Sequence, residues 1–179
     1  MKEIRLHGRG GQGVVKASHI VVKAAVRKDG YGQFIPFFGV ERKGSPVFGF
    51  LRLSDAPIRR KTQVYAPDIL VIFDDTLVKL PATYAGLKEG GTVIINSTKT
   101  AEELDIPAQA GEIAIVDATG ISESLFGKNM PNTSMLGALA KVTDMVDKDA
   151  LFDEIAEAFG ESNRTAAQKA YDTVAITGK

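Results

Sequence analysis

The feature that most constrains this chain is the stretch 4–13, with the sequence IRLHGRGGQG. It is typical of a short strand that runs directly into a glycine loop, and the helix-forming segment 14–28 follows it. Gly8, Gly10 and Gly13 have the spacing G-x-G-x-x-G. In that pattern the first glycine permits a tight turn, the second lets the backbone approach an anion, and the third lets the helix start close to the sheet. The stretch predicts a phosphate cradle at a helix N-terminus, with a structural turn that binds nothing as the alternative.

Apolar runs that alternate with helical segments predict an α/β fold with a mainly parallel or mixed sheet. The runs 69–73, 92–96 and 113–116 are expected to be central strands, parallel to the first. A helix is expected over 77–87, and Pro81 favours a later start for it. These features predict a three-layer α/β/α, Rossmann-like domain with helices on both faces of the sheet.

The remaining segments complete this picture. Residues 31–38 are expected to form an edge strand or an extended loop, because Pro36 lacks a backbone donor. The last third is expected to be helical, with a final helix that starts at Ser162 or Asn163 and reaches Ile176. No repeat, low-complexity tract or linker interrupts the chain, so residues 1–179 are expected to form a single domain.

Composition excludes several classes of function. Lys+Arg 22 balances Asp+Glu 22, so no strong overall field favours nucleic acid. The chain has no cysteine, which excludes disulfides, cysteine nucleophiles and cysteine-ligated iron–sulfur clusters. With His7 and His19 as its two histidines, a histidine-rich metal site is not expected. No apolar run is long enough to span a bilayer and no signal-peptide core is present, so a cytoplasmic location is expected.

The ligand of the glycine loop is predicted to be rich in phosphate. A dinucleotide would need an acidic residue at the end of the second strand, and the segment 31–38 ends without one. Arg9 adds a cation inside the loop, and Arg42-Lys43-Gly44-Ser45 offers further cations with accessible backbone. For the ligand of the loop, an NADP-type phosphate is the alternative. For Arg42-Lys43-Gly44-Ser45, the alternative is a solvated charged turn without a ligand.

Three further motifs have mainly structural interpretations. Pro131-Asn132-Thr133-Ser134 is typical of a helix N-terminus, which can also hold a ligand or a partner. Asp74-Asp75 is expected to cap a helix. The basic run Arg59-Arg60-Lys61 lies in a short segment, 58–64, that is predicted to continue the sheet, so that neighbouring side chains would face opposite ways.

Taken together, these stretches resemble the gamma subunit, or gamma domain, of the 2-oxoacid:ferredoxin oxidoreductases, of the pyruvate synthase type. The resemblance covers nearly the whole chain and is weakest between 98 and 128. Its motifs, in order, are Ile4-Arg5-Leu6-His7-Gly8-Arg9-Gly10-Gly11-Gln12-Gly13, Phe38-Gly39-Val40-Glu41-Arg42-Lys43-Gly44-Ser45-Pro46-Val47, Pro57-Ile58-Arg59 with Thr62-Gln63-Val64-Tyr65 and Pro67-Asp68, and Pro131-Asn132-Thr133-Ser134-Met135-Leu136-Gly137.

The resemblance implies one subunit of a multi-subunit enzyme of anaerobic metabolism. Such enzymes oxidatively decarboxylate a 2-oxoacid, here most similar to the pyruvate or branched-chain types, form an acyl-coenzyme A and pass electrons to ferredoxin. Thiamine diphosphate and iron–sulfur clusters are expected on alpha, beta and delta-type partner subunits, so the chain alone should be inert. No catalytic residue and no metal site is expected on it.

In fused relatives the equivalent domain contributes to coenzyme A binding. The resemblance carries that role to Gly8, Arg9, Gly10, Gly11, Gln12, Gly13, Arg42, Lys43, Gly44, Ser45 and Asn132. Two alternatives stay open at this point: a stand-alone NADP-binding oxidoreductase domain, and a purely structural subunit whose glycine loop braces the assembly.

Overall fold

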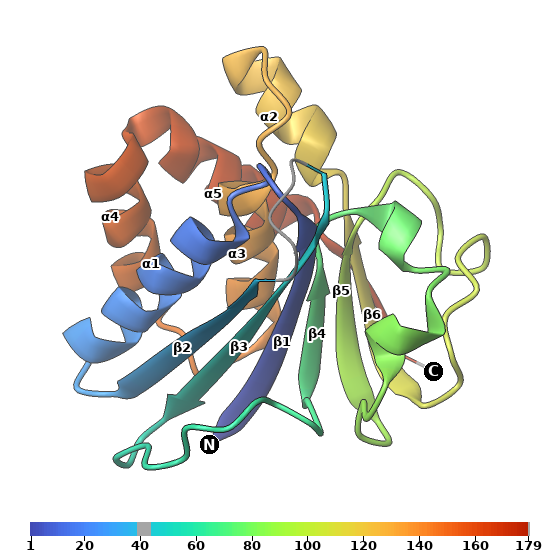
Figure 1. The fold of residues 1–179 in the computed structure, drawn as a ribbon. Coiled ribbons are helices and arrows are strands. Elements are labelled where there is room, and N and C mark those ends of the chain that lie inside the picture. The colour runs from blue at the N-terminus through green and yellow to red at the C-terminus, as the bar shows by residue number, and fades with distance from the viewer. Residues whose placement is uncertain (39–43, 179) are drawn as a thin grey trace.

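The computed structural model describes residues 1–38 and 44–178, and Figure 1 shows the fold. Within that part, seven strands form one sheet in the order β2-β3-β1-β4-β5-β6-β7. The strands are β1 (Lys2–Arg9), β2 (Tyr31–Phe38), β3 (Pro46–Ser54), β4 (Ile69–Ile72), β5 (Gly91–Asn96), β6 (Ala110–Val116) and β7 (Ala175–Gly178). The α-helices are α1 (Val14–Arg27), α2 (Ala118–Phe126), α3 (Asn132–Val142), α4 (Lys148–Phe159) and α5 (Glu161–Thr173).

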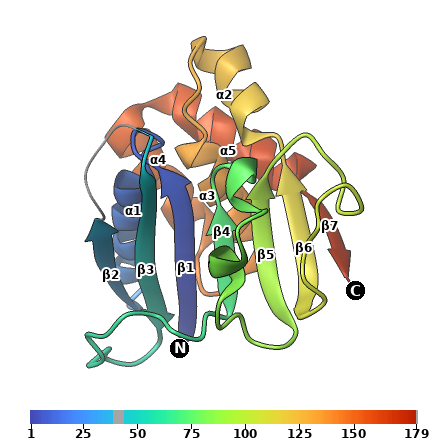
Figure 2. The same cartoon turned by 45° about the vertical axis from the view of Figure 1, so that its right-hand side comes forward.

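The centre of the sheet is parallel and its two sides are antiparallel (Figure 2). β1, β4, β5 and β6 run in the same direction, so the prediction of three central strands parallel to the first is confirmed. β3 reverses against β1, β2 reverses against β3, and β7 reverses against β6. The α/β class is therefore confirmed, with a mixed sheet, and β2 is the edge strand that Pro36 predicts.

One face of the sheet is covered by α1, α3, α4 and α5 (Figure 1). Their apolar side chains meet those of β1, β3 and β4 in the larger core. α3 lies deepest, because every residue from Asn132 to Ala140 is buried. This helix therefore holds the helical layer together, and its N-terminus is fixed against the carboxyl end of the sheet.

The opposite face is covered by short turns instead of long helices. The α-helix expected over 77–87 is wrong: two 3-10 helices, Asp75–Leu77 and Pro81–Tyr84, occupy the segment. Pro81 explains the break, because it has no N–H to donate and is tolerated only in a first helical turn, where it now stands. The apolar side chains of these turns still cover β4, β5 and β6 and form a second core, with members Leu70, Ile72, Leu77, Tyr84, Leu87, Val93, Ile95 and Ile113.

The last helix ends earlier than expected. α5 begins at Glu161 directly after Gly160 and stops at Thr173, and the chain then forms β7 instead of reaching Ile176 as a helix. The reason is tertiary: Ile176 pairs with Ala114 at the open edge of β6. No helix among the described residues is long and apolar enough to cross a membrane.

Candidate functional site

The chain connections diverge between β1 and β4. From β1 the chain continues through α1 on the helical face, and from β4 it continues through the 3-10 turns on the other face. Ligands of open α/β sheets bind at such a point, outside the carboxyl ends of the strands. The glycine loop follows β1 at this edge, Asp74 lies just beyond β4, and a crevice of about 360 Å³ opens beside both.

The glycines of the loop have roles that differ from the expected ones. The left-handed conformations fall at Gly11 (φ 99°) and Gly13 (φ 77°), so these two residues make the turn. A Cβ on Gly8 would lie 2.5 Å from Val14 Cγ2, so the first glycine, and not only the third, permits the close approach of α1. A Cβ on Gly13 would lie 2.7 Å from Asn132 Nδ2. The loop is therefore tightly packed on its inner side.

Three segments that the sequence placed separately meet here. The Gly10 N–H donates to the carbonyl oxygen of Ser45 at 2.9 Å, and the Gly44 N–H donates to the Gly10 carbonyl oxygen at 3.3 Å. Asn132, which is 1% exposed, packs against Gly13 from the start of α3. The predicted Gly44, Ser45 and Asn132 thus join the glycine loop in one site. Arg42 and Lys43 lie outside the described residues.

Arg9 and Gln12 tie the loop to the carboxyl end of β4. Gln12 Oε1 accepts from the Arg9 N–H at 2.7 Å, and Gln12 Nε2 donates to Asp74 Oδ2 at 3.0 Å. The Arg9 guanidinium donates to Thr76 Oγ1 at 2.7 Å and to the Gly44 carbonyl oxygen at 3.1 Å, and it lies 3.4 Å from Asp74 Oδ2. Both side chains therefore bond to other parts of the same chain and hold the loop in place.

The open hydrogen-bond donors of the site are backbone N–H groups. α1 has Gly13 at its N-cap with no side-chain cap, and no acidic residue in its first turn. Among the described residues, the N–H groups of Gly11 and Gly13 have no hydrogen-bond partner. Together with the first-turn N–H groups of α1, which have no intrahelical acceptor, they give this end of the loop a positive potential. The arrangement can hold an anion such as a phosphate.

The neighbouring crevice is rich in acceptors that the fold already uses. Asp74 caps the first 3-10 turn through the Thr76 N–H, as predicted, and Asp117 caps α2 through the Gly120 N–H. Asn96 donates to the Phe73 carbonyl oxygen and to Thr119 Oγ1, both at 2.9 Å. Asn96 and Thr119 were missed from the sequence, because nothing near either residue indicates that they meet. These groups fix the shape of the crevice beside the loop.

His7 is buried just before the loop. It is 1% exposed, its Nε2 accepts from Arg5 Nε at 2.9 Å, and its ring meets Phe48 edge-on at 4.9 Å. Burial, and then the nearby positive charge of Arg5, lower its pKa from 6.5 to about 3. His7 is therefore a neutral, structural acceptor for Arg5.

This burial predicts a pH dependence of stability. The folded His7 stays neutral while the unfolded chain takes up a proton below about pH 6.5, so stability falls as pH drops from about 6.5 toward about 3. The loss from this group approaches about 1.4 kcal/mol per pH unit. In His7→Gln the amide oxygen can still accept from Arg5, but the side chain does not take up a proton. We therefore expect the free energy of unfolding of this variant, measured with urea, to fall less steeply than that of the wild type between pH 6.5 and pH 4.5.

His19→Gln is the matched control for this experiment. His19 is exposed and its replacement leaves the buried His7 and Arg5 in place, so the wild-type pH dependence should persist. A His7→Gln slope equal to that of the wild type would show that His7 does not carry the effect.

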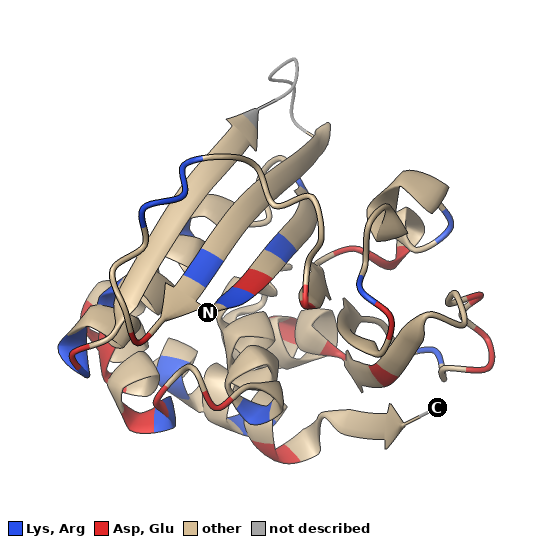
Figure 3. Cartoon of the chain, turned by 90° about the horizontal axis from the view of Figure 1, so that it is seen from below, with Lys and Arg blue, Asp and Glu red and all other residues tan. Residues whose placement is uncertain are grey.

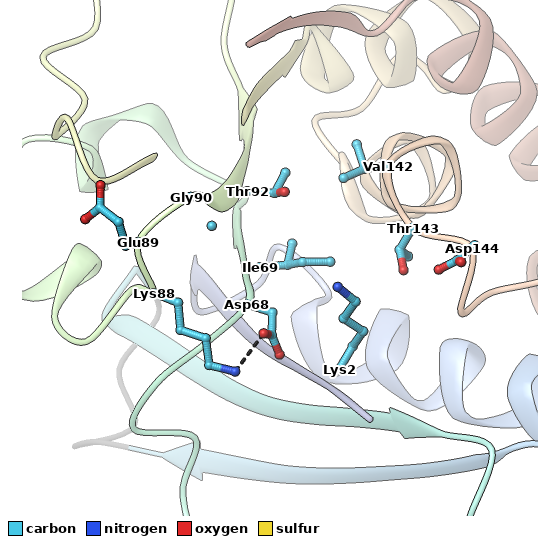
Figure 4. Close-up of a pocket in the computed structure, with 11 residues that line it drawn as sticks. Lys2, Asp68, Ile69, Lys88, Glu89, Gly90, Thr92, Val142, Thr143 and Asp144 are labelled. Atoms are coloured by element: carbon cyan, nitrogen blue, oxygen red, sulfur yellow. Dashed lines mark hydrogen bonds and ion pairs between the residues drawn. The ribbon is translucent and has the colours of Figure 1, made fainter. Parts of the chain in front are cut away.

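A small polar pocket lies at the amino ends of the parallel strands, at the other end of the sheet from the glycine loop (Figure 4). Asp68 accepts there from the Glu3 N–H at 2.7 Å and pairs with Lys88 at 2.7 Å. Burial opposes the ionised form, but the Glu3 and Lys88 bonds outweigh it and the pKa of Asp68 lies below its ordinary value. Asp68 thus fastens the amino end of β4 to β1, which is a structural role.

Comparison with known proteins identifies the family. Residues 3–173 match the model of the pyruvate ferredoxin/flavodoxin oxidoreductase family. The chain is 45% identical to the common gamma subunit of the pyruvate/ketoisovalerate oxidoreductases of Thermococcus kodakarensis, over 98% of both chains. It is also 45% identical to pyruvate synthase subunit PorC of Methanothermobacter marburgensis, over 99% of this chain and 100% of that one.

Solved structures agree with this assignment. The pyruvate oxidoreductase subunit PORC of Thermotoga maritima matches with a TM-score of 0.88 and 34% identity, over 99% of both chains. The 2-oxoglutarate:ferredoxin oxidoreductase of Magnetococcus marinus shares the fold, with a TM-score of 0.76 and 18% identity, over 96% of this chain and 30% of that one. The chain therefore belongs to the pyruvate ferredoxin/flavodoxin oxidoreductase family, as a gamma subunit of a multi-subunit 2-oxoacid:ferredoxin oxidoreductase.

Proposed function

We propose that the glycine loop binds a phosphate group of coenzyme A in the assembled oxidoreductase. The observation that carries this proposal is that the N–H groups of Gly11, Gly13 and the uncapped start of α1 have no partner in the part of the chain that the structure describes. Coenzyme A carries several phosphates, and the reaction of such enzymes needs it as the acyl acceptor. The Magnetococcus marinus relative, which shares the fold, was solved with coenzyme A bound.

Within the site we assign different tasks to the predicted residues. Gly11 and Gly13 supply the donors, Gly8 leaves room for α1, and Gly10 bonds the loop to Gly44 and Ser45 through its backbone. Arg9, Gln12, Gly44, Ser45 and Asn132 position the loop through the contacts described above. Arg9 contributes its positive charge from a fixed place, without turning its guanidinium to the ligand.

The rest of the enzyme completes the chemistry in this proposal. The full chain has no cysteine, so cluster ligation belongs to other subunits, of the alpha, beta and delta types. Thiamine diphosphate, bound on those subunits, supplies the decarboxylation of the 2-oxoacid, which we propose to be pyruvate. The gamma chain alone is inert, and the enzyme works in the cytoplasm.

Gly11→Ala tests the cradle. Among the described residues, no atom lies within 4 Å of the Cβ position at Gly11, so the methyl group meets no steric clash there. It would strain the left-handed backbone and displace the N–H groups. Losing one hydrogen bond to a charged phosphate costs about 1.5–3 kcal/mol, so the KM for coenzyme A in the reconstituted enzyme should rise at least about tenfold. The release of carbon dioxide without coenzyme A should not change.

Gly160→Ala is the control, because Gly160 has a similar φ of 90° and equally open surroundings between α4 and α5. It should leave the KM for coenzyme A unchanged. If Gly11→Ala behaves in the same way, the loop is a structural turn. Titration of the enzyme with NADPH tests the alternative of an NADP site. If the loop binds coenzyme A as proposed, NADPH should not bind.

A further inference from the structure

The segment between β3 and β4 forms an irregular, basic loop. It lies beside the amino ends of the parallel strands, at the other end of the sheet from the glycine loop. The expected strand over 58–64 is wrong, since the segment pairs with none of the strands in the described part of the chain. Arg59, Arg60 and Lys61 are consequently all exposed, and their side chains do not alternate between two faces. Tyr65, farther along, is 71% exposed. Figure 3 shows Lys and Arg side by side on this loop at the underside of the protein.

The loop is irregular but firmly anchored. Arg52, whose side chain is 0% exposed, donates to the carbonyl oxygens of Thr62 at 2.8 Å and Gln63 at 3.0 Å. Val64 is 1% exposed, so the loop also inserts an apolar side chain into the protein. A Cβ on Gly86 would lie 2.0 Å from the Tyr65 carbonyl oxygen, which shows how closely the loop is packed. Long loops that a compact domain holds in this way usually serve a function.

The ion pairs of the described residues involve one of the three cations of this loop. Arg60 lies 3.4 Å from Glu3 Oε1, and Glu3 in turn pairs with the buried Arg52. Among the described residues, Arg59 and Lys61 form no ion pair. Of the nearest acids along the chain, the exposed Asp55 forms no ion pair with either cation among the described residues, and Asp68 is already paired with Lys88. Since the whole chain has a formal net charge of +0, the loop is a local positive patch and not part of a general field.

We propose that this basic loop, residues 59–65, docks onto an acidic segment of another subunit of the same oxidoreductase. Arg59 and Lys61 would pair with carboxylates, and Tyr65 would pack beside them. Arginine and tyrosine are the residue types that dominate the energetics of protein interfaces. A loop that is ordered before binding loses little conformational entropy when the partner arrives.

This surface is separate from the coenzyme A cradle. The loop runs from the end of β3 to the start of β4, beside the amino ends of the parallel strands, whereas the cradle lies at their carboxyl ends. β1 alone, at roughly 3.3 Å per residue, separates the two edges by about 25 Å. The proposal rests on membership of a multi-subunit enzyme family, and it holds whether or not the cradle binds coenzyme A.

The double variant Arg59→Glu/Lys61→Glu tests the docking. The enzyme is purified through a tag on another subunit, and the retained gamma chain is quantified over a range of salt concentrations. At about 0.1 M salt, where charges interact over about 10 Å, retention should fall at least tenfold from the wild-type value. Lys23→Glu/Lys169→Glu makes the same charge change on exposed lysines of α1 and α5 and should be retained like the wild type.

Two results would overturn the proposal: wild-type retention of the loop variant, or an equal loss in the control. Carbodiimide cross-linking of the intact complex gives a second readout, because it joins the Lys61 ammonium to a touching carboxylate as an amide, with loss of water. Mass spectrometry should find Lys61 joined to an aspartate or glutamate of another subunit. Lys61 joined only to carboxylates of its own chain would also overturn the docking.

Discussion

Replacing Gly137 with alanine is expected to lower the free energy of unfolding by about 3 kcal/mol or more. A Cβ at this position would lie 2.0 Å from the carbonyl oxygen of Ala167 in α5, far inside van der Waals contact. The oxygen belongs to a helix backbone, so it cannot move aside as a flexible side chain could. α3 is buried along its length and cannot retreat either. The two helices would have to separate and lose packing in the larger core.

Urea unfolding of the wild type and the variant measures this effect. Gly127→Ala is a suitable control, because Gly127 ends α2 in a left-handed conformation and no described residue has an atom within 4 Å of its Cβ position. The free energy of unfolding of that control should fall by about 1 kcal/mol, which is the cost of a left-handed backbone at alanine. A Gly137→Ala variant no less stable than the control would mean that the α3–α5 contact can relax.

The fold could be predicted from sequence where local pattern decides it. Apolar runs bounded by turns predicted the central strands, and the glycine loop between a strand and a helix was located correctly. Pro81 was noticed, but its full effect, two 3-10 turns in place of an α-helix, depends on packing over β4 and β5. β7 could not be predicted from its own sequence, because it is a strand only through pairing with β6.

The candidate site could be predicted in part. The motifs around Gly10, Gly44 and Asn132 were identified one by one, and the structure brings them together. The side chain of Arg9 was expected to reach a ligand. It instead donates to Thr76 and pairs with Asp74, which lie more than sixty residues farther along the chain. A sequence shows that a cation is present, and only the fold shows whether the protein already uses it.

Arg52 shows the same limit with a larger energetic consequence. It is a charged residue within the largely apolar strand β3, yet its side chain is completely buried. It donates to Glu3 Oε1 at 2.8 Å and to two carbonyl oxygens of the basic loop. We expect Arg52→Met to lower the free energy of unfolding by about 3–5 kcal/mol, because it leaves the Glu3 carboxylate buried without its main partner.

Arg164→Met is the matched control in urea unfolding. Arg164 also pairs with a carboxylate, that of Asp153 at 2.9 Å, but both side chains lie at the surface, 40% and 47% exposed. Exposed ion pairs contribute little, so this variant should unfold at nearly the wild-type urea concentration. Equal effects of the two substitutions would contradict the importance that we assign to the buried pair.

A second substitution separates the two tasks of Arg52. Adding Glu3→Gln to Arg52→Met removes the stranded charge, so the double variant should regain much of the lost stability. It cannot restore the bonds to Thr62 and Gln63, so the basic loop should still be loose. Trypsin cleaves after arginine and lysine, and cleavage within residues 59–61 should therefore be faster in the double variant than in the wild type. Wild-type cleavage with stability regained would mean that Val64 and the contact with Gly86 hold the loop without Arg52.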